Sequence, residues 1–159
     1  MLIDYRNVNI DQMSQQVLRN VNFSIDEGEF VYITGKVGSG KSSLIKTLYA
    51  ELEIEEGEAY VMGYDMCKMK SKHIPELRRK IGIIFQDFQL LIDRCVEDNL
   101  RFVLKATGWK DKMEIDNRIQ EVLDLVGMGT KGYKYPYELS GGEQQRIAIA
   151  RAILNSPKL

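Results

Sequence analysis

One glycine-rich octapeptide constrains the fold of this chain more than any other feature. It reads Gly35-Lys36-Val37-Gly38-Ser39-Gly40-Lys41-Ser42 and matches the pattern GxxxxGK[ST]. The apolar run before it, residues 30–34 (FVYIT), is short and rich in β-branched residues, which predicts a buried strand. Residues 42–52 after it are predicted to form a helix. We therefore expect the strand, loop and helix unit of an α/β domain.

The octapeptide has the chemistry of a phosphate-binding loop. Glycines let successive backbone N–H groups turn toward phosphate oxygens, and the following helix adds its positive dipole end. We expect Lys41 to reach the β- and γ-phosphates, Ser42 to place its hydroxyl on Mg²⁺, and Ser43 to donate to the α-phosphate. The candidate nucleotide-binding residues here are Gly35, Gly38, Ser39, Gly40, Lys41, Ser42 and Ser43. The alternative is a glycine turn followed by a surface lysine.

A second motif begins at Leu139 and reads LSGGEQQR, directly before a predicted helix that ends near Asn155. It resembles the signature sequence of the ATP-binding-cassette (ABC) ATPases, and GKVGSGKS is similar to their Walker A loop. The resemblance implies that Ser140, Gly141 and Gly142 bind the γ-phosphate of ATP held by a second subunit, in a head-to-tail homodimer. Ser140 and Glu143 also form the pattern of a helix capping box, which is compatible with that role.

Gln86 follows the run IGIIF (residues 81–85), which is a second candidate for a buried strand. It resembles the Q-loop glutamine of the same family, which implies contact with Mg²⁺ and sensing of the γ-phosphate. By itself such a glutamine is more often a surface residue. The resemblance thus assigns metal contacts to Ser42 and Gln86, and catalytic roles to Lys41, Gln86, Ser140 and Gly142.

The stretch from Phe85 to Asn99 (FQDFQLLIDRCVEDN) is most similar to the FtsE-type cell-division branch of the family. That resemblance implies an FtsX-like integral membrane partner, control of peptidoglycan hydrolases, and a cytoplasmic position at the inner face of the bacterial plasma membrane. Four apolar loop residues, Phe88, Leu90, Leu91 and Ile92, are candidates for docking on the partner, or else they cover the core beneath the loop. Two alternatives remain: the ATPase subunit of a lipoprotein-release or exporter-type ABC transporter, and an ATP-gated clamp that does not hydrolyse ATP.

Composition narrows the classes of partner. The 22 Lys and Arg residues against 23 Asp and Glu leave a net charge of −1, which provides no broad field for nucleic acid or anionic lipid. No apolar run approaches the roughly 20 residues of a membrane helix, so we expect no direct membrane insertion. Cys67 and Cys95 fit no metal or redox pattern, and His73 is expected to be a solvated loop residue.

The predicted organisation is a single ABC ATPase domain over residues 1–159, of the α/β P-loop NTPase class. It has a β-rich and P-loop core (1–85), a Q-loop and helical subdomain (86–139) and a signature helix (140–155). Strands are expected at 3–10, 17–25 and 56–63, the first two antiparallel, and further helices at 96–106 and 113–126, where apolar residues recur at helical spacing.

The sequence departs from the family pattern at its C-terminal end and in the region that usually contacts adenine. The sequence given ends before a Walker B strand would begin, so we expect an incomplete C-terminus, little ATP hydrolysis by these 159 residues, and exposed apolar flanks around Ile33 and Ile83. The family usually stacks adenine on an aromatic residue between the first two strands. Ile10, Asp11, Gln12 and Met13 occupy that region, so we expect Ile10 or Met13 to provide an apolar contact instead.

Overall fold

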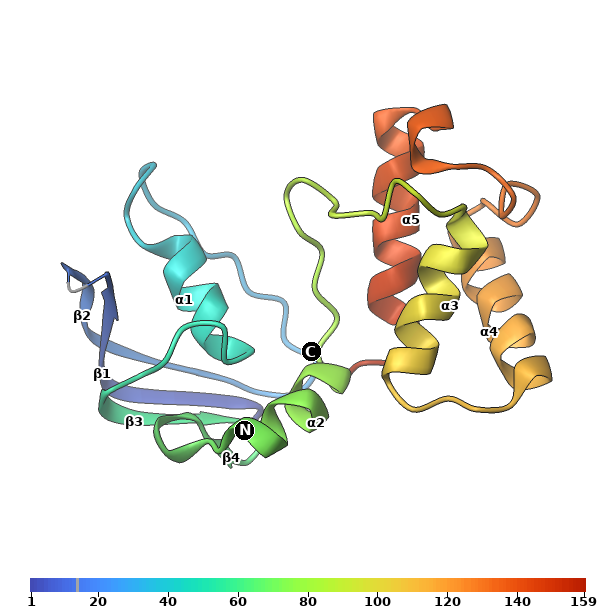
Figure 1. Cartoon of the computed structure of the whole chain (residues 1–159). Helices are drawn as coiled ribbons and strands as arrows, with labels where there is room; N and C mark the ends of the chain where they lie inside the picture. The colour runs from blue at the N-terminus through green and yellow to red at the C-terminus, as the bar shows by residue number, and fades with distance from the viewer. Residues whose placement is uncertain (14) are drawn as a thin grey trace. The chain divides into compact units, whose positions relative to one another are not determined.

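The computed structural model describes residues 1–13 and 15–159 in two units, Met1–Leu77 and Arg78–Leu159, each with buried apolar side chains of its own (Figure 1). The first unit carries the strands and the glycine-rich loop. The second carries the helices α3, α4 and α5.

The sheet of the first unit has four antiparallel strands in the order β2-β1-β3-β4. These are β1 (Ile3–Gln12), β2 (Gln15–Ile25), β3 (Glu56–Val61) and β4 (Tyr64–Asp65). Strand β1 is central because its inward side chains form the core, and Ile3, Tyr5, Val8 and Ile10 are at most 1% exposed. The predicted antiparallel pair is confirmed, although both strands run further into the turn than expected.

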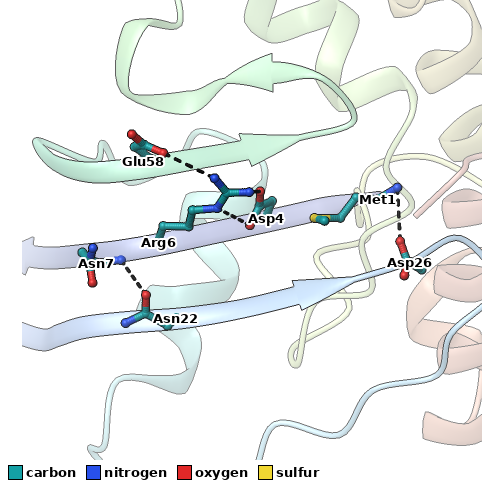
Figure 2. Close-up of polar contacts among 7 residues, drawn as sticks. All are labelled: Met1, Asp4, Arg6, Asn7, Asn22, Asp26 and Glu58. Atoms are coloured by element: carbon teal, nitrogen blue, oxygen red, sulfur yellow. Dashed lines mark hydrogen bonds and ion pairs between the residues drawn. The ribbon is translucent and has the colours of Figure 1, made fainter.

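Polar contacts fix the exposed side of β1 against its neighbours (Figure 2). Arg6 binds Asp4 on its own strand at 2.6 Å and approaches Glu58 of β3 at 3.9 Å. The backbone N–H of Asn7 donates to Asn22 Oδ1 of β2 at 2.9 Å. These exposed pairs contribute little stability individually, but they agree with the strand order that the buried face requires.

Helix α1 (Lys41–Leu48) lies over the sheet and is joined to it by a buried hydrogen bond (Figure 1). The hydroxyl groups of Tyr5 and Thr47 are 2.9 Å apart, and burial raises the pKa of Tyr5 to about 12. The helix ends four residues before the expected Leu52, because Ala50 adopts a left-handed conformation (φ 55°) that turns the chain away.

The two predicted buried strands are not formed. Phe30 and Tyr32 are 82% and 81% exposed, Ile33 is 40% exposed, and residues 30–34 have no strand partner in the described part of the chain. Gly82 donates to the carbonyl of Leu159 at 2.7 Å and Leu159 N donates back to the carbonyl of Lys80 at 3.3 Å, but the described residues provide no further strand pairing for residues 81–85, and Ile83 is partly buried. Both predictions are wrong for one reason: an apolar run becomes a strand only when a neighbouring strand satisfies its backbone groups.

The second unit is a cluster of helices around one apolar core. Helices α3 (Val96–Ala106), α4 (Lys112–Leu125) and α5 (Gly141–Ile153) pack against one another in pairs. Asp111 caps α4 by accepting from Glu114 N, and Gly127 (φ 70°) ends it as expected. The core comprises Val96, Leu100, Leu104, Ile115, Ile119, Val122, Leu123, Met128, Leu139, Ile147, Ala150 and Leu154. The three helices expected here are confirmed to within two residues at each end.

Four short helices were not predicted. They are α2 (Ile74–Arg79) and the 3-10 turns η1 (Met66–Lys68), η2 (Ser71–His73) and η3 (Pro136–Glu138). Three of them lie in the segment 66–80, whose polar composition shows no apolar stripe long enough to predict a helix.

Candidate functional site

The glycine-rich loop leads directly into helix α1, as the strand, loop and helix motif requires. Gly38 and Gly40 have φ of 79° and 89°, a region that side chains disfavour. A Cβ on Gly40 would also lie 2.8 Å from Val17 Cγ1, so β2 packs where only glycine fits. The loop conformation therefore depends on Gly40, which the pattern fixes, and on Gly38, which lies at a position that the pattern leaves open.

Lys41 is the first residue of α1, and its side chain folds back along the loop. Its ammonium donates to the carbonyls of Gly35 and Lys36, both at 2.8 Å. Among residues 1–13 and 15–159, no side chain caps the first backbone N–H groups of α1, since Gly40 occupies the N-cap. A lysine ammonium and uncapped amides at a positive helix end together form an arrangement that favours an anion.

A pocket of about 300 Å³ opens beside the loop. It is lined by Gln12, Val17, Gly38, Ser39, Gly40, Lys41, Ser42 and Ser43. The structure thus gathers six of the seven loop residues named from the sequence. Gly35 is not among the described residues that line the pocket, but its carbonyl accepts a hydrogen bond from Lys41.

The hairpin between β1 and β2 forms the rest of this pocket. Gln12 Oε1 accepts a hydrogen bond from the Ser43 hydroxyl at 2.9 Å. Ile10 is fully buried in the sheet core, so the expectation that it offers an apolar contact to a base is wrong. Met13 is 92% exposed, and Ser14 beside it lies outside the described residues. Sequence reasoning placed Gln12 in this region but named only Ile10 or Met13 as the contact, and it missed Val17, whose neighbours in the glycine loop lie more than 20 positions away.

The second motif forms the N-terminus of helix α5. Ser140 Oγ accepts from Glu143 N at 3.3 Å, and the Glu143 carboxylate accepts from Ser140 N at 2.9 Å, which completes the capping box. Lys131 pairs with the same carboxylate, and these donors, with Lys131 the stronger, lower the pKa of Glu143 to about 2. The carboxylate is therefore ionised across the physiological range and holds the helix start in place.

Gly141 and Gly142 have no packing partner that requires glycine. A Cβ at either position would meet no atom within 4 Å, and neither has a positive φ. At Gly132, by contrast, a Cβ would meet the side chain of Glu97, which would have to move. The packing of this unit therefore gives neither glycine a structural role.

Gln86 is exposed, and the segment after it is anchored to α5. Phe88 and Gln89 both adopt left-handed conformations, with φ of 60° and 47°. Arg151 of α5 donates to their carbonyls at 2.5 and 2.6 Å, and burial lowers the pKa of its guanidinium. Arg151 was not predicted as a functional residue, because nothing in its sequence neighbourhood indicates a partner 62 positions away.

The loop that follows contains both buried and exposed apolar residues. Leu90 packs against the helical core, whereas Leu91 and Ile92 are 36% and 73% exposed. Asn99 fastens this loop to α3: it is 2% exposed, accepts from Leu91 N at 2.7 Å, and donates to the carbonyls of Leu91, Arg94 and Cys95. Asn99 also went unrecognised, although a polar residue on the apolar face of a predicted helix is a usable signal.

Other functional groups are scarce in the described residues. Cys67 and Cys95 are free thiols, and burial is the main cause that raises the pKa of each. No cluster of His, Cys, Asp or Glu side chains in residues 1–13 and 15–159 has the geometry of a metal site. None of the described helices has the length and apolarity needed to span a bilayer.

Comparison with known proteins places these features in one family. The family model described as ABC transporter matches residues 18–159. The cell division ATP-binding protein FtsE of Streptococcus pneumoniae is 48% identical over 142 residues, which is 89% of this chain and 61% of that protein. The Escherichia coli protein of the same name is 41% identical over 90% of this chain and 64% of its own length. The chain thus spans about three fifths of these relatives.

Solved structures agree with the sequence comparison. The dimeric structure of a bacterial ABC transporter cassette matches with a TM-score of 0.86 and 34% identity, over 98% of this chain and 70% of that one. A dimeric post-hydrolysis state of the same ATP-binding cassette, bound to ADP and Pi, matches with a TM-score of 0.85 and 33% identity, over the same shares of the two chains. The predicted α/β P-loop fold and the similarity to FtsE are confirmed.

Proposed function

Because the chain belongs to the ABC transporter family, we propose that it is the ATP-binding and ATP-hydrolysing subunit of an FtsE/FtsX-like complex. The observation that carries the proposal is the pocket at Gly38–Ser43, where Lys41 and uncapped helix amides converge beside a loop that only glycine can form. We also propose that residues 1–159 form one ABC domain, made of a core (1–85), a helical subdomain (86–139) and a signature helix (140–155).

The chain's own groups fit a bound triphosphate. The amides at the start of α1 need acceptors, and phosphate oxygens would provide them. Lys41 would exchange the carbonyls of Gly35 and Lys36 for β- and γ-phosphate oxygens, which are stronger acceptors because they are charged. Ser43 would donate to the α-phosphate.

The pocket also fits the magnesium ion that accompanies ATP. Ser42 lines the pocket next to Lys41 and presents the hydroxyl oxygen that Mg²⁺ accepts as a ligand. When bound, Mg²⁺ neutralises charge on the β- and γ-phosphates. We propose Gln86, whose side chain is exposed, as the second residue at the metal.

We propose that ATP joins two copies of the chain head to tail, with Ser140, Gly141 and Gly142 of one copy against the γ-phosphate held by the other. Support comes from the open space around Gly141 and Gly142, which a ligand could enter closely. The related cassette structures are dimers, and one holds ADP and Pi. Lys41, Gln86, Ser140 and Gly142 would then act on the reacting phosphate.

The membrane partner is proposed from the similarity to FtsE and from the exposed loop beside α3. Ile92 and Leu91 present apolar surface, and Asn99 fixes the loop that bears them. We propose that they dock an FtsX-like integral membrane protein, through which the ATPase cycle controls peptidoglycan hydrolases at division. The protein would then act peripherally at the inner face of the plasma membrane.

ATP-driven dimerisation tests this proposal. Gly142→Asp places a carboxylate where the partner's γ-phosphate would lie, and the open space at Gly142 means that the monomer tolerates the change. Met113→Asp is the matched control, since Met113 is 73% exposed and is likewise the second residue of its helix.

Sedimentation velocity with Mg–ATP would be run on the protein as its gene encodes it. We expect the wild type and Met113→Asp to dimerise with ATP, and Gly142→Asp to bind ATP but remain monomeric. Equal dimerisation of all three proteins would contradict the proposed role of the signature motif.

A further inference from the structure

The segment at residues 68–80 is the most basic part of the chain. It contains six of the 22 Lys and Arg residues but one of the 23 Asp and Glu residues, so its net charge is +5 when His73 is neutral. The rest of the chain has 16 basic and 22 acidic residues and carries a net charge of −6. The net charge of the whole chain, −1, therefore conceals a local concentration of positive charge.

Buried and capped residues hold the first part of this segment in place. Met66, just before it, is 7% exposed, and Leu77 in helix α2 is fully buried. The Asp65 carboxylate accepts from Cys67 N at 3.1 Å and from Lys68 N at 3.3 Å, which fixes the turn η1. That turn packs against strand β3. The residues between these anchors therefore have a defined orientation on the first unit.

The side chains between the two anchors lie in two environments. Met69 and Ser71 line a pocket of about 390 Å³ in the first unit. Lys68, Lys70 and Lys72 are exposed and are not among the described residues that line it. The backbone at Met69 and Lys70 is extended, so neighbouring side chains point to opposite sides. The three lysines thus share the solvent side of the segment, and we call this surface the lysine face.

Little negative charge compensates the lysine face. Asp65 Oδ2 lies 3.4 Å from Lys68 Nζ, and this side chain of Lys68 is 84% exposed. The other two lysines have no hydrogen bond or ion pair with any residue that the structure describes. Glu53 and Glu55 line the pocket, so they lie on the side of the segment that the lysines do not face. The lysine face therefore offers uncompensated positive charge to an external anion.

We infer that the lysine face binds the anionic headgroups of a phospholipid membrane. Such a surface attracts clusters of basic residues, and each lysine near it strengthens binding by about fivefold. The six basic residues of the segment are enough for this kind of attraction. The inference goes beyond the proposed function, which gives the protein a membrane partner but no contact of its own with lipid.

The composition of the segment favours lipid headgroups over nucleic acid. Residues 68–80 contain no Phe, Tyr or Trp, so they lack the aromatic side chains on which unpaired bases stack. The lysine face also contains no arginine, which is the basic residue that suits nucleic-acid recognition best. Lysine is a compact point charge and needs only a nearby anion.

The test is co-sedimentation of the protein, as its gene encodes it and purified without a membrane partner, with lipid vesicles. One set of vesicles contains equal parts of phosphatidylglycerol and phosphatidylcholine, and the other contains phosphatidylcholine alone. The triple variant of the lysine face is Lys68→Gln, Lys70→Gln and Lys72→Gln. The matched control removes the same charge from three exposed lysines of the second unit, by Lys105→Gln, Lys110→Gln and Lys112→Gln.

We expect the wild type and the control to bind only the anionic vesicles, with an affinity that falls as the salt concentration rises. The triple variant of the lysine face should bind them about 100-fold more weakly. An equal loss in the control would overturn the inference, because net charge alone would then explain binding. Failure of the wild type to bind anionic vesicles, or equal binding to neutral ones, would also overturn it.

Two further measurements separate this inference from its alternatives. Affinity for a DNA duplex is measured with the same three proteins, and tighter binding to DNA than to anionic vesicles through the lysine face would overturn the lipid assignment. Affinity for Mg–ATP should be the same in all three proteins, because the substituted lysines are exposed and lie outside the glycine-loop pocket. Absence of ATP binding in all three would contradict the proposed function, whereas the vesicle results alone decide the inference about lipid.

Discussion

Arg151→Ala should free the segment after Gln86 while helix α5 remains intact. The guanidinium donates to the carbonyls of Phe88 and Gln89 at 2.5 and 2.6 Å, and both residues adopt left-handed conformations. Such conformations persist only when surrounding contacts hold them. Alanine favours the helix at least as well as arginine does, so α5 itself loses nothing from the change.

The size of the effect follows from three contributions. Two charged hydrogen bonds stabilise the loop by about 1.5–3 kcal/mol each. Desolvation of the guanidinium, which lowers the pKa of Arg151, offsets part of this gain, and relief of backbone strain at Phe88 and Gln89 offsets about 1–2 kcal/mol more. A net loss of about 2 kcal/mol remains, which corresponds to about 30-fold faster local opening.

Hydrogen exchange followed by mass spectrometry measures this opening in peptides that cover residues 85–92. Arg146→Ala is the control, because Arg146 lies on the same helix, is exposed and has no hydrogen bond or ion pair with any residue that the structure describes. We expect about 30-fold faster exchange in these peptides for Arg151→Ala and no change for Arg146→Ala. Unchanged exchange at 85–92 in Arg151→Ala would refute the idea that this side chain holds the loop.

Three further predictions concern stability. Asn99→Ala should lower the free energy of unfolding in urea by about 3 kcal/mol, because it leaves several buried backbone groups unpaired. The control is Asn117→Ala, since Asn117 is exposed. A loss under about 1 kcal/mol for Asn99→Ala, or the same loss for both variants, would contradict the role of Asn99. Glu143 has its pKa lowered to about 2 by Lys131 and Ser140 N, so its contribution is complete above the unfolded-state pKa near 4.5 and disappears as the pH falls toward 2. When the free energy of unfolding is measured against pH, Glu143→Gln should therefore lose less stability than the wild type as the pH falls from 4.5 toward 2. An equal loss in the two proteins would show that Glu143 does not pair with Lys131 in solution. Tyr5 has its pKa raised to about 12, so its neutral form stabilises the fold below the unfolded-state pKa of 10, and this contribution disappears between pH 10 and 12. Thermal melts should show the wild type losing about 2 kcal/mol more than Tyr5→Phe between pH 9 and 11.5, and an equal loss would argue against burial as the cause.

The helical part of the fold could be predicted from the sequence because its signals are local. The apolar stripe of α4 and the cap at Asp111 lie within a few residues of the helix that they define. The run at residues 30–34 has equally clear local signals, yet it does not form a strand, because pairing depends on a neighbour that local sequence does not specify. Local pattern predicts helices better than strands for this reason.

The same difference between local signals and distant partners applies to the candidate site. The glycine loop could be found because each of its parts is adjacent in sequence. The hydrogen bond between Gln12 and Ser43 could not, because these residues lie 31 positions apart, and the partners of Arg151 are at least 62 positions away. The glycine pair 141–142 shows the opposite case: the sequence motif indicates a role, while the packing of the fold gives these glycines none.

The affinity for Mg–ATP with and without the Lys41 side chain tests the central claim most directly. Lys36→Ala is the matched control, because Lys36 is an exposed lysine in the same loop. We predict that Lys41→Ala weakens ATP binding by about 10- to 100-fold, as expected for the loss of charged hydrogen bonds to phosphate, and that Lys36→Ala changes it by less than about threefold. Equal affinities for the wild type and Lys41→Ala would contradict the assignment of this loop as the ATP site.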